Sequence, residues 1–399
     1  MGEYARPYTL STESVDYPAR FVDGGWSDMN EIRQRYLQAV GTAVVKLGTQ
    51  LLSDKDGRLD GDFIGRIADQ VATLRGRGIR VAVVSSGAIG AGLRELGLPK
   101  RPTDLAKLQA VAAVGQRKLM DVWADAFSRH KLPVAQILLT REDVDDRTRF
   151  LNLRNTIGAI HEMGAIPIIN ENDTVSTDEL VKISFGDNDL LAALVAHALR
   201  ADLLVLLSVV DGILDAHGHS VRLIDHVDAA RDLVRAEKSA LGKGGFNSKL
   251  EAARQVTDFG EAMIVANGRM ENILPRLIDC EELGTLFVPS GKKASSRSRW
   301  IGSARPAGPI VVDEGAVRAL VEKNRSLLPA GIVNVDGSFV RGDVVAIQSS
   351  AGVVIARGLS NYDADDVRRI CGKKTAEVRA VLADAAYDEV VHRDNLVVV

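Results

Sequence analysis

The chain has 399 residues, of which 46% are hydrophobic, and its formal net charge is -3 at pH 7. This length predicts two domains, and the small net charge gives no general attraction to nucleic acid or to an anionic membrane. No apolar run is long enough to span a bilayer, and the N-terminus lacks a secretory pattern. The two cysteines, Cys280 and Cys371, are too far apart in sequence to indicate a disulfide framework or a CxxC metal site. We therefore expect a cytoplasmic protein.

The N-terminal part, residues 1–36, is predicted to be a loosely ordered extension. Residues 1–28 are rich in Tyr, Gly, Ser and Asp without sustained periodicity, and a helical pattern begins at Met29. Two interpretations remain open, namely a loose extension or a natural start at Met29.

From residue 37 to 290 the sequence alternates between apolar β-rich runs and helical patterns. The runs lie at 43–47, 79–84, 134–139, 165–169, 203–207 and 262–266. Between the first two, Phe63, Ile67, Val71 and Leu74 recur at helical spacing. This alternation predicts βαβ units and an α/β domain with a largely parallel sheet. Ligands of such sheets bind beyond the carboxyl ends of the strands.

Polar loops fall where those carboxyl ends are expected. They are Lys46–Thr49, Ser85–Ala88, Asn170–Asp173, Phe185–Asp189 and Gly242–Lys249. Taken singly, an Asn or Asp before a helix is an ordinary cap, and a lysine is usually a surface residue. The glycines match neither the dinucleotide nor the phosphate-loop spacing. Glycines, helix N-termini and lysines at one edge nevertheless favour a site that handles anions.

The pattern changes after Phe287. Residues 289–307 contain five basic residues and no acid, so we interpret 291–307 as a linker. Short strands and turns follow, and the Asp336-Gly337 pair within 332–347 is typical of a tight hairpin. Residues 308–399 are therefore predicted to form a small β-rich domain.

The motifs together carry a resemblance that spans nearly all of the chain after residue 40. It rests on Val45–Thr49, Ser86–Ile89, Ala113–Gln116, Leu138–Arg141, Ile169–Asp173, Gly186–Asp189 and the loop from Gly244 to Lys249, in this order. The chain resembles the amino acid kinase family, and within it the glutamate 5-kinases. Its C-terminal part, with Val312–Ala316 and Ser326–Ile332, resembles a PUA domain. The resemblance implies an αβα sandwich with a mainly parallel central sheet, followed by a PUA domain.

The activity implied by the resemblance is transfer of the ATP γ-phosphoryl group, with Mg²⁺, to the side-chain carboxylate of L-glutamate, the first step toward proline. That carboxylate is ionised at neutral pH, so it needs no general base. The reaction needs alignment and charge stabilisation instead.

The resemblance also assigns roles to residues. Lys46, Lys249 and Asp189 are implied as catalytic, and the implied glutamate-binding residues are Ser86, Asp173, Asn188 and Asp187. The implied ATP-binding residues are Lys46, Ser208, Val209, Lys243, Gly244, Gly245, Phe246, Asn247, Ser248 and Lys249. The sequence departs from the family at Val209, where an acidic residue is common and where Asp211 comes two positions later, and at Gln50, where Ser is common. His217-Gly218-His219 is interpreted as a solvated turn, so no metal ligand is assigned.

Alternatives and partners follow from the same resemblance. Sister kinases acting on acetylglutamate, aspartate, carbamate or uridylate would share the lysines, whereas the loops at 170–173 and 186–189 favour glutamate. RNA binding by the PUA domain is disfavoured, because residues 308–399 contain 11 Lys and Arg against 13 Asp and Glu. The resemblance further implies a homo-oligomer, feedback inhibition by proline and a downstream glutamyl phosphate reductase, with no membrane partner.

Overall fold

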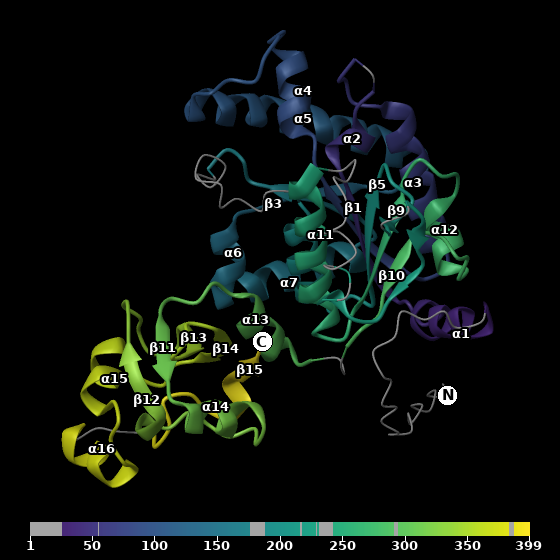
Figure 1. Cartoon of the computed structure of the whole chain (residues 1–399). Helices are drawn as coiled ribbons and strands as arrows, with labels where there is room; N and C mark the ends of the chain where they lie inside the picture. The colour runs from purple at the N-terminus through teal and green to yellow at the C-terminus, as the bar shows by residue number, and fades with distance from the viewer. Residues whose placement is uncertain are drawn as a thin grey trace, which may run out of the picture.

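A computed structural model of the chain describes residues 26–54, 56–175, 188–215, 218–228, 230, 242–290, 294–382 and 387–399. Figure 1 shows a large α/β domain and a smaller β-rich domain that meet near helix α13. None of the described helices combines the length and the apolar composition that crossing a bilayer requires.

The large domain is built on an eight-stranded sheet in the order β3-β4-β2-β1-β5-β9-β10-β8. Its neighbouring strands are parallel, except that β10 runs antiparallel to β9. The six strands predicted from sequence are confirmed. The strands are β1 (Thr42–Leu47), β2 (Arg80–Ser85), β3 (Val134–Leu139), β4 (Ile166–Glu171), β5 (Leu203–Ser208), β8 (Leu223–Ile224), β9 (Ala262–Asn267) and β10 (Thr285–Phe287), with β6 (Ile213–Leu214) and β7 (Ser220–Val221) pairing apart from the sheet.

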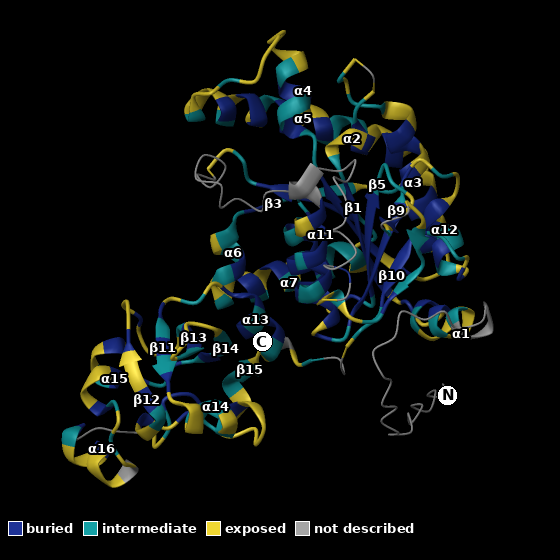
Figure 2. Ribbon diagram, in the orientation of Figure 1, coloured by how far each residue is buried: buried dark blue, intermediate teal, exposed yellow. Residues whose placement is uncertain are grey.

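Helices cover both faces of this sheet because successive residues of each buried strand point to opposite sides. Val44 packs in one core and its neighbour Val45 in the other. The first core is closed by α7 (Arg147–Glu162), α9 (Asp189–Leu199), α11 (Gly242–Thr257) and α13 (Ser296–Ser303), and the second by α3 (Gly61–Gly76), α5 (Leu105–Ser128) and α12 (Ile273–Ile278). Shorter helices are α2 (Thr49–Leu52), α4 (Ala88–Glu95) and α6 (Arg141–Asp145). The buried strands appear dark blue in Figure 2.

The N-terminal part differs from the prediction, because residues 26–37 form helix α1 (Trp26–Leu37), which contains Met29. Arg33 of this helix is 1% exposed, and its guanidinium donates to the carbonyl oxygens of Arg222 and Leu283 at 3.2 and 3.1 Å. Burial lowers the pKa of Arg33 to about 10. The helix is therefore attached to the β8–β10 edge by contacts that the local sequence does not predict.

The predicted linker is also wrong over α13, which belongs to the core of the large domain. Trp300 and Ile301 are buried in the same cluster as the leucines of α9. Arg299 is fully buried and forms an ion pair with the fully buried Glu261, whose other carboxylate oxygen lies 3.0 Å from Nδ1 of His197. A basic residue that sequence composition assigns to a solvated linker is thus a buried structural residue.

The C-terminal domain holds a five-stranded sheet in the order β12-β11-β13-β14-β15. The predicted hairpin at Asp336-Gly337 is wrong, because β12 and β13 both pair with β11, which lies between them. Gly337 does adopt a φ of 74° at the turn. The elements are β11 (Pro309–Val312), β12 (Ile332–Val335), β13 (Val344–Ser349), β14 (Val354–Leu359), β15 (Leu396–Val398), α14 (Glu314–Val321), α15 (Ala364–Ile370), α16 (Thr375–Val381) and the 3₁₀ turns η1 (Pro329–Gly331) and η2 (Arg393–Asn395).

The two domains meet through α13. Arg357 of β14 donates to the carbonyl oxygens of Gly302 and Ala304 at 2.6 and 3.2 Å. Val344 of the C-terminal domain is buried in the same cluster as the α9 side chains. The C-terminal domain therefore covers apolar surface of the large domain as well as its own core.

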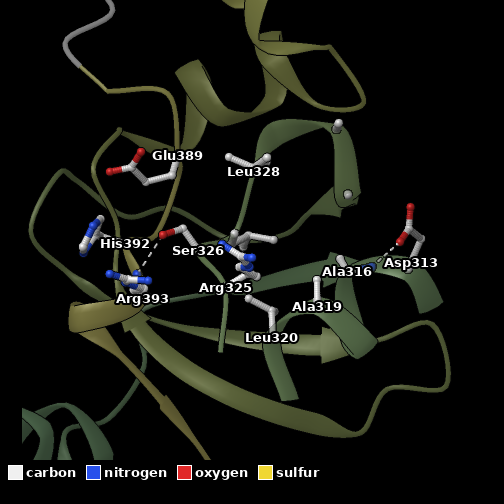
Figure 3. A pocket seen from close by; sticks show the side chains of 14 residues that line it. Asp313, Ala316, Ala319, Leu320, Arg325, Ser326, Leu328, Glu389, His392 and Arg393 are labelled. Carbon is white, nitrogen blue, oxygen red and sulfur yellow. Dashed lines mark hydrogen bonds between the residues drawn. The ribbon is translucent and has the colours of Figure 1, made fainter. Parts of the chain in front are cut away.

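A cavity of about 670 Å³ opens in the C-terminal domain (Figure 3). Ala316, Ala319 and Leu320 of α14 form its apolar side. Leu327 and Leu328 also line the cavity, and its polar side chains are those of Asp313, Arg325, Ser326, Glu389, His392 and Arg393. This lining carries charges of both signs.

The buried pair of Glu261 and Arg299 should dominate the attachment of α13. Replacing Glu261 with Gln leaves the Arg299 charge buried without a carboxylate, so we expect a loss of roughly 3–5 kcal/mol in the free energy of unfolding, measured by urea titration. The control is Asp279→Asn, which breaks the exposed pair with Arg77 (2.7 Å) and should cost less than about 1 kcal/mol. Equal losses in the two variants would contradict this role.

Candidate active site

Two lysines and one aspartate meet at the carboxyl edge of the large sheet. Nζ of Lys46, near the end of β1, lies 2.7 Å from Oδ1 of Asp189, the first residue of α9. Nζ of Lys249, from α11, lies 3.0 Å from Oδ2 of the same carboxylate. All three side chains are buried. The structure thus brings together the three residues predicted to be catalytic.

The electrostatics of this cluster keep the aspartate ionised. Burial alone would raise the pKa of the Asp189 carboxyl, but the charges of Lys46 and Lys249, with their hydrogen bonds, lower it below its usual value. Ser248 donates a further hydrogen bond to Oδ2 at 3.1 Å. Two ammonium groups and one carboxylate leave one net positive charge, which suits an anionic ligand.

A second group of predicted residues meets around Asn188, the residue that precedes α9. Nδ2 of Asn188 donates to Oγ of Ser86 at 2.9 Å, to Oδ1 of Asn170 at 2.9 Å and to the carbonyl oxygen of Ser85 at 3.2 Å. The end of β4, the loop after β2 and the start of α9 are therefore joined by neutral hydrogen bonds. This group lies beside the charged cluster, because Asn188 and Asp189 are adjacent in the chain.

The Ser86 loop is held in place by close packing of α4 against α5. A Cβ atom on Gly115 would lie 1.8 Å from the carbonyl oxygen of Ala88, and one on Gly92 would lie 1.9 Å from that of Val111. Gly87 has a φ of 101°, a conformation that other residues rarely adopt. Glycine at these three positions therefore fixes the backbone that presents Ser86.

The two remaining residues predicted to bind glutamate are placed less completely. Asp173 is half-buried and follows β4, at the same edge of the sheet as Ser86. Asp187 lies outside the described residues.

The residues predicted to bind ATP fall on β5 and α11. Ser208 ends β5 half-buried, and Val209 packs against the core. In α11 the Phe246 side chain is buried in the core, so only its backbone is available to a ligand, whereas Asn247 is exposed. Lys243, Gly244 and Gly245 lie at the start of α11, where the structure describes the backbone alone.

The sequence reasoning missed the end of β9. Nδ2 of Asn267 donates to Oδ1 of Asp211 at 2.9 Å, and Arg269 donates to the carbonyl oxygen of Gln50 at 3.2 Å. These contacts join the end of β9 and the residues after it to the loop after β5 and to α2. The signal available in the sequence was the polar stretch that follows the last apolar run of the domain.

Comparisons with known proteins identify the family of the chain. A model of the amino acid kinase family matches residues 41–267, and a PUA domain model matches residues 308–382. The chain is 43% identical to the glutamate 5-kinase of Syntrophus aciditrophicus, covering 93% of this chain and 97% of that protein. It is 44% identical to the glutamate 5-kinase of Geobacter sp. strain M21, covering 92% and 100%, and 44% identical to that of Methylococcus capsulatus, covering 89% and 96%. The chain therefore belongs to the amino acid kinase family, in its glutamate 5-kinase branch, with a C-terminal PUA domain.

Proposed function

We propose that this chain transfers the γ-phosphoryl group of ATP to the side-chain carboxylate of L-glutamate, and that Lys46, Lys249 and Asp189 carry the reaction. The product is L-glutamyl 5-phosphate, the first intermediate of proline biosynthesis. The observation that supports these roles is the convergence of two buried ammonium groups on one buried carboxylate.

The mechanism needs charge stabilisation more than proton transfer. The substrate carboxylate is already ionised, and the transferring phosphoryl group carries negative charge on its oxygens. Lys46 and Lys249 approach from different elements, so they can contact different phosphate oxygens. Asp189 binds both ammonium groups and keeps them fixed before the substrates arrive, which favours the transition state.

Mg²⁺ would enter this site with ATP. Within the described residues no group of three or more His, Cys, Asp and Glu side chains gathers as a metal site. Mg²⁺ commonly binds substrate phosphates and water with few protein ligands, so the residues present fit a metal carried by the nucleotide. When bound, the ion would neutralise charge on the phosphates.

Glutamate would bind between the loops that meet at Asn188. The Ser86 hydroxyl and the backbone amides of its loop suit the α-carboxylate. Asp173 and the side-chain oxygen of Asn188 suit the ammonium group, with Asp187 assisting. The same neutral hydrogen-bonded group favours glutamate over the substrates of sister kinases.

The oligomeric state, the inhibitor and the downstream enzyme are predicted from the family. A homo-oligomer, feedback inhibition by proline and consumption of the product by a glutamyl phosphate reductase are proposed on family grounds. RNA binding is not favoured, because the acidic Asp313 and Glu389 line the cavity of Figure 3 together with Arg325 and Arg393, so the cavity does not present an unbroken basic surface.

The reaction is tested by measuring ATP consumption with L-glutamate, N-acetylglutamate and L-aspartate in parallel, with hydroxylamine trapping the acyl phosphate. We expect hydroxamate with L-glutamate and little with the other two acids. Preferred turnover of either alternative would replace the proposed substrate.

Replacing Lys46 or Lys249 should lower kcat more than it changes KM. Lys46→Met or Lys249→Met removes one preorganised charge, so kcat should fall roughly 10²–10³-fold with a smaller change in KM for glutamate. Lys118→Met, which alters an exposed lysine of α5, is the control and should leave kcat unchanged. Near-normal turnover in either active-site variant would remove that lysine from the mechanism.

Replacing Asp173 or Asn188 should weaken glutamate binding. Asp173→Asn and Asn188→Ala should raise KM for glutamate while KM for ATP stays close to that of the unaltered protein, because both side chains are assigned to the amino acid. If proline shares this pocket, inhibition should weaken in the same variants. A rise confined to KM for ATP would overturn the assignment.

The kinase domain should work without the PUA domain. A chain ending at Ala307 keeps α13 and every proposed site residue, so we expect phosphoryl transfer to persist. Its melting temperature should fall, since the surface covered by Val344 becomes exposed. The full-length Arg357→Met variant, which removes only the contacts to α13, is the matched control. A folded truncation without turnover would show that residues 308–399 complete the site.

A further inference from the structure

A buried glutamine lies directly behind the residues proposed to bind glutamate. Gln116, on α5, is 7% exposed, and its Oε1 accepts a hydrogen bond from Nδ2 of Asn170 at 2.9 Å. Oδ1 of Asn170 in turn accepts from Nδ2 of Asn188 at 2.9 Å. Three amide side chains from α5, β4 and the start of α9 therefore form one chain of hydrogen bonds.

The direction of each hydrogen bond in this chain is set by the backbone. An amide side chain can present either its oxygen or its nitrogen, and its partners decide which. The backbone N–H of Glu171 can only donate, and it lies 2.9 Å from Oδ1 of Asn170. Nδ2 of Asn170 must then face Gln116, and Gln116 must present its oxygen.

The same reasoning orients Asn188. Its Nδ2 donates to the backbone carbonyl oxygen of Ser85, which can only accept, so this nitrogen faces the protein. Its Oδ1 has no partner among the described residues and remains available as an acceptor. Ser86 Oγ accepts from Asn188, so its hydroxyl proton remains available to a ligand.

These orientations match the polarity of an α-amino acid. An ammonium group needs an acceptor, which Asn188 Oδ1 supplies, and a carboxylate needs a donor, which the Ser86 hydroxyl supplies. If the side-chain amide of Asn188 were flipped by 180°, its nitrogen would present a donor to the ammonium group. Selectivity for the amino acid thus depends on what holds this amide in one orientation.

We propose that Gln116 is a positioning residue that fixes the orientation of Asn170 and Asn188 and so makes the site selective for a substrate with an α-ammonium group. This inference rests on the proposed function. Gln116 Nε2 is buried and has no hydrogen-bond partner among the described residues, so the side chain contributes as an acceptor alone. A residue that keeps an acceptor oxygen at this position should therefore replace it.

The test compares kcat/KM for L-glutamate with kcat/KM for glutarate, which has the same carboxylates but no ammonium group. In Gln116→Leu we expect the ratio of the two values to fall by about tenfold or more, because losing one hydrogen bond in a low-dielectric site releases the amide chain. In Gln116→Glu the ratio should stay within about twofold of that of the unaltered protein, because a carboxyl oxygen accepts the same bond in either protonation state.

Gln70→Leu is the matched control. Gln70 is 5% exposed, and its Oε1 accepts a 2.9 Å hydrogen bond from the backbone N–H of Leu274, on α12. This variant should lower the melting temperature without changing the substrate ratio or KM for ATP. Two buried glutamines of similar exposure are thereby compared, one inside and one outside the chain of amide hydrogen bonds.

The outcomes separate a failure of the proposed function from a failure of the role proposed for Gln116. If the unaltered protein does not phosphorylate L-glutamate, the proposed function fails. If it does, and folded Gln116→Leu keeps the substrate ratio, Gln116 has no positioning role. An equal fall of the ratio in Gln70→Leu, or in Gln116→Glu, would also overturn the inference. Should Gln116→Leu not fold, Gln116→Met carries the same expectation as Leu.

Discussion

Asp189 is the point on which the site depends, because its buried carboxylate holds two ammonium groups that would otherwise repel each other. Removing a carboxylate from water is costly, and only the two lysine charges and the hydrogen bonds compensate for that cost. The arrangement requires β1, α9 and α11 to arrive at one place, since each supplies one member of the cluster. The central part of the fold is therefore the scaffold that such a cluster needs.

Two neighbouring residues of the site take part in different kinds of polar interaction. Asp189 belongs to a charged group, and its neighbour Asn188 belongs to a group of neutral amides and a hydroxyl. Charged contacts suit phosphate oxygens, whereas neutral amides with fixed direction distinguish donors from acceptors. In the proposed function, Asp189 thus serves the stabilisation of phosphoryl charge, and the adjacent Asn188 serves the recognition of the amino acid.

The sequence predicts much of this arrangement. Strands such as β1 and β5 are recognisable because a strand buried on both faces is largely apolar. The polar positions near strand ends and helix starts include Lys46, near the end of β1, and Asn188 and Asp189, at the start of α9. Contacts between residues that are far apart in the chain cannot be recognised from the sequence. Arg33 and Arg299 are charged residues that become buried against distant groups, so composition assigns them to solvent. The Asp336-Gly337 turn is local, but the strand that pairs with both of its neighbours comes from earlier in the chain.

Helix α9 begins at Asp189 and carries His197 near its other end, next to Glu261, which pairs with Arg299 of α13. Its 11 residues span about 16 Å as one rigid rod. The boundary at which domains can be exchanged therefore lies after α13, not before it. A chimera that joins this kinase domain to another C-terminal domain has to carry residues 294–304 with the kinase, or it removes Arg299, which pairs with Glu261 at the far end of α9.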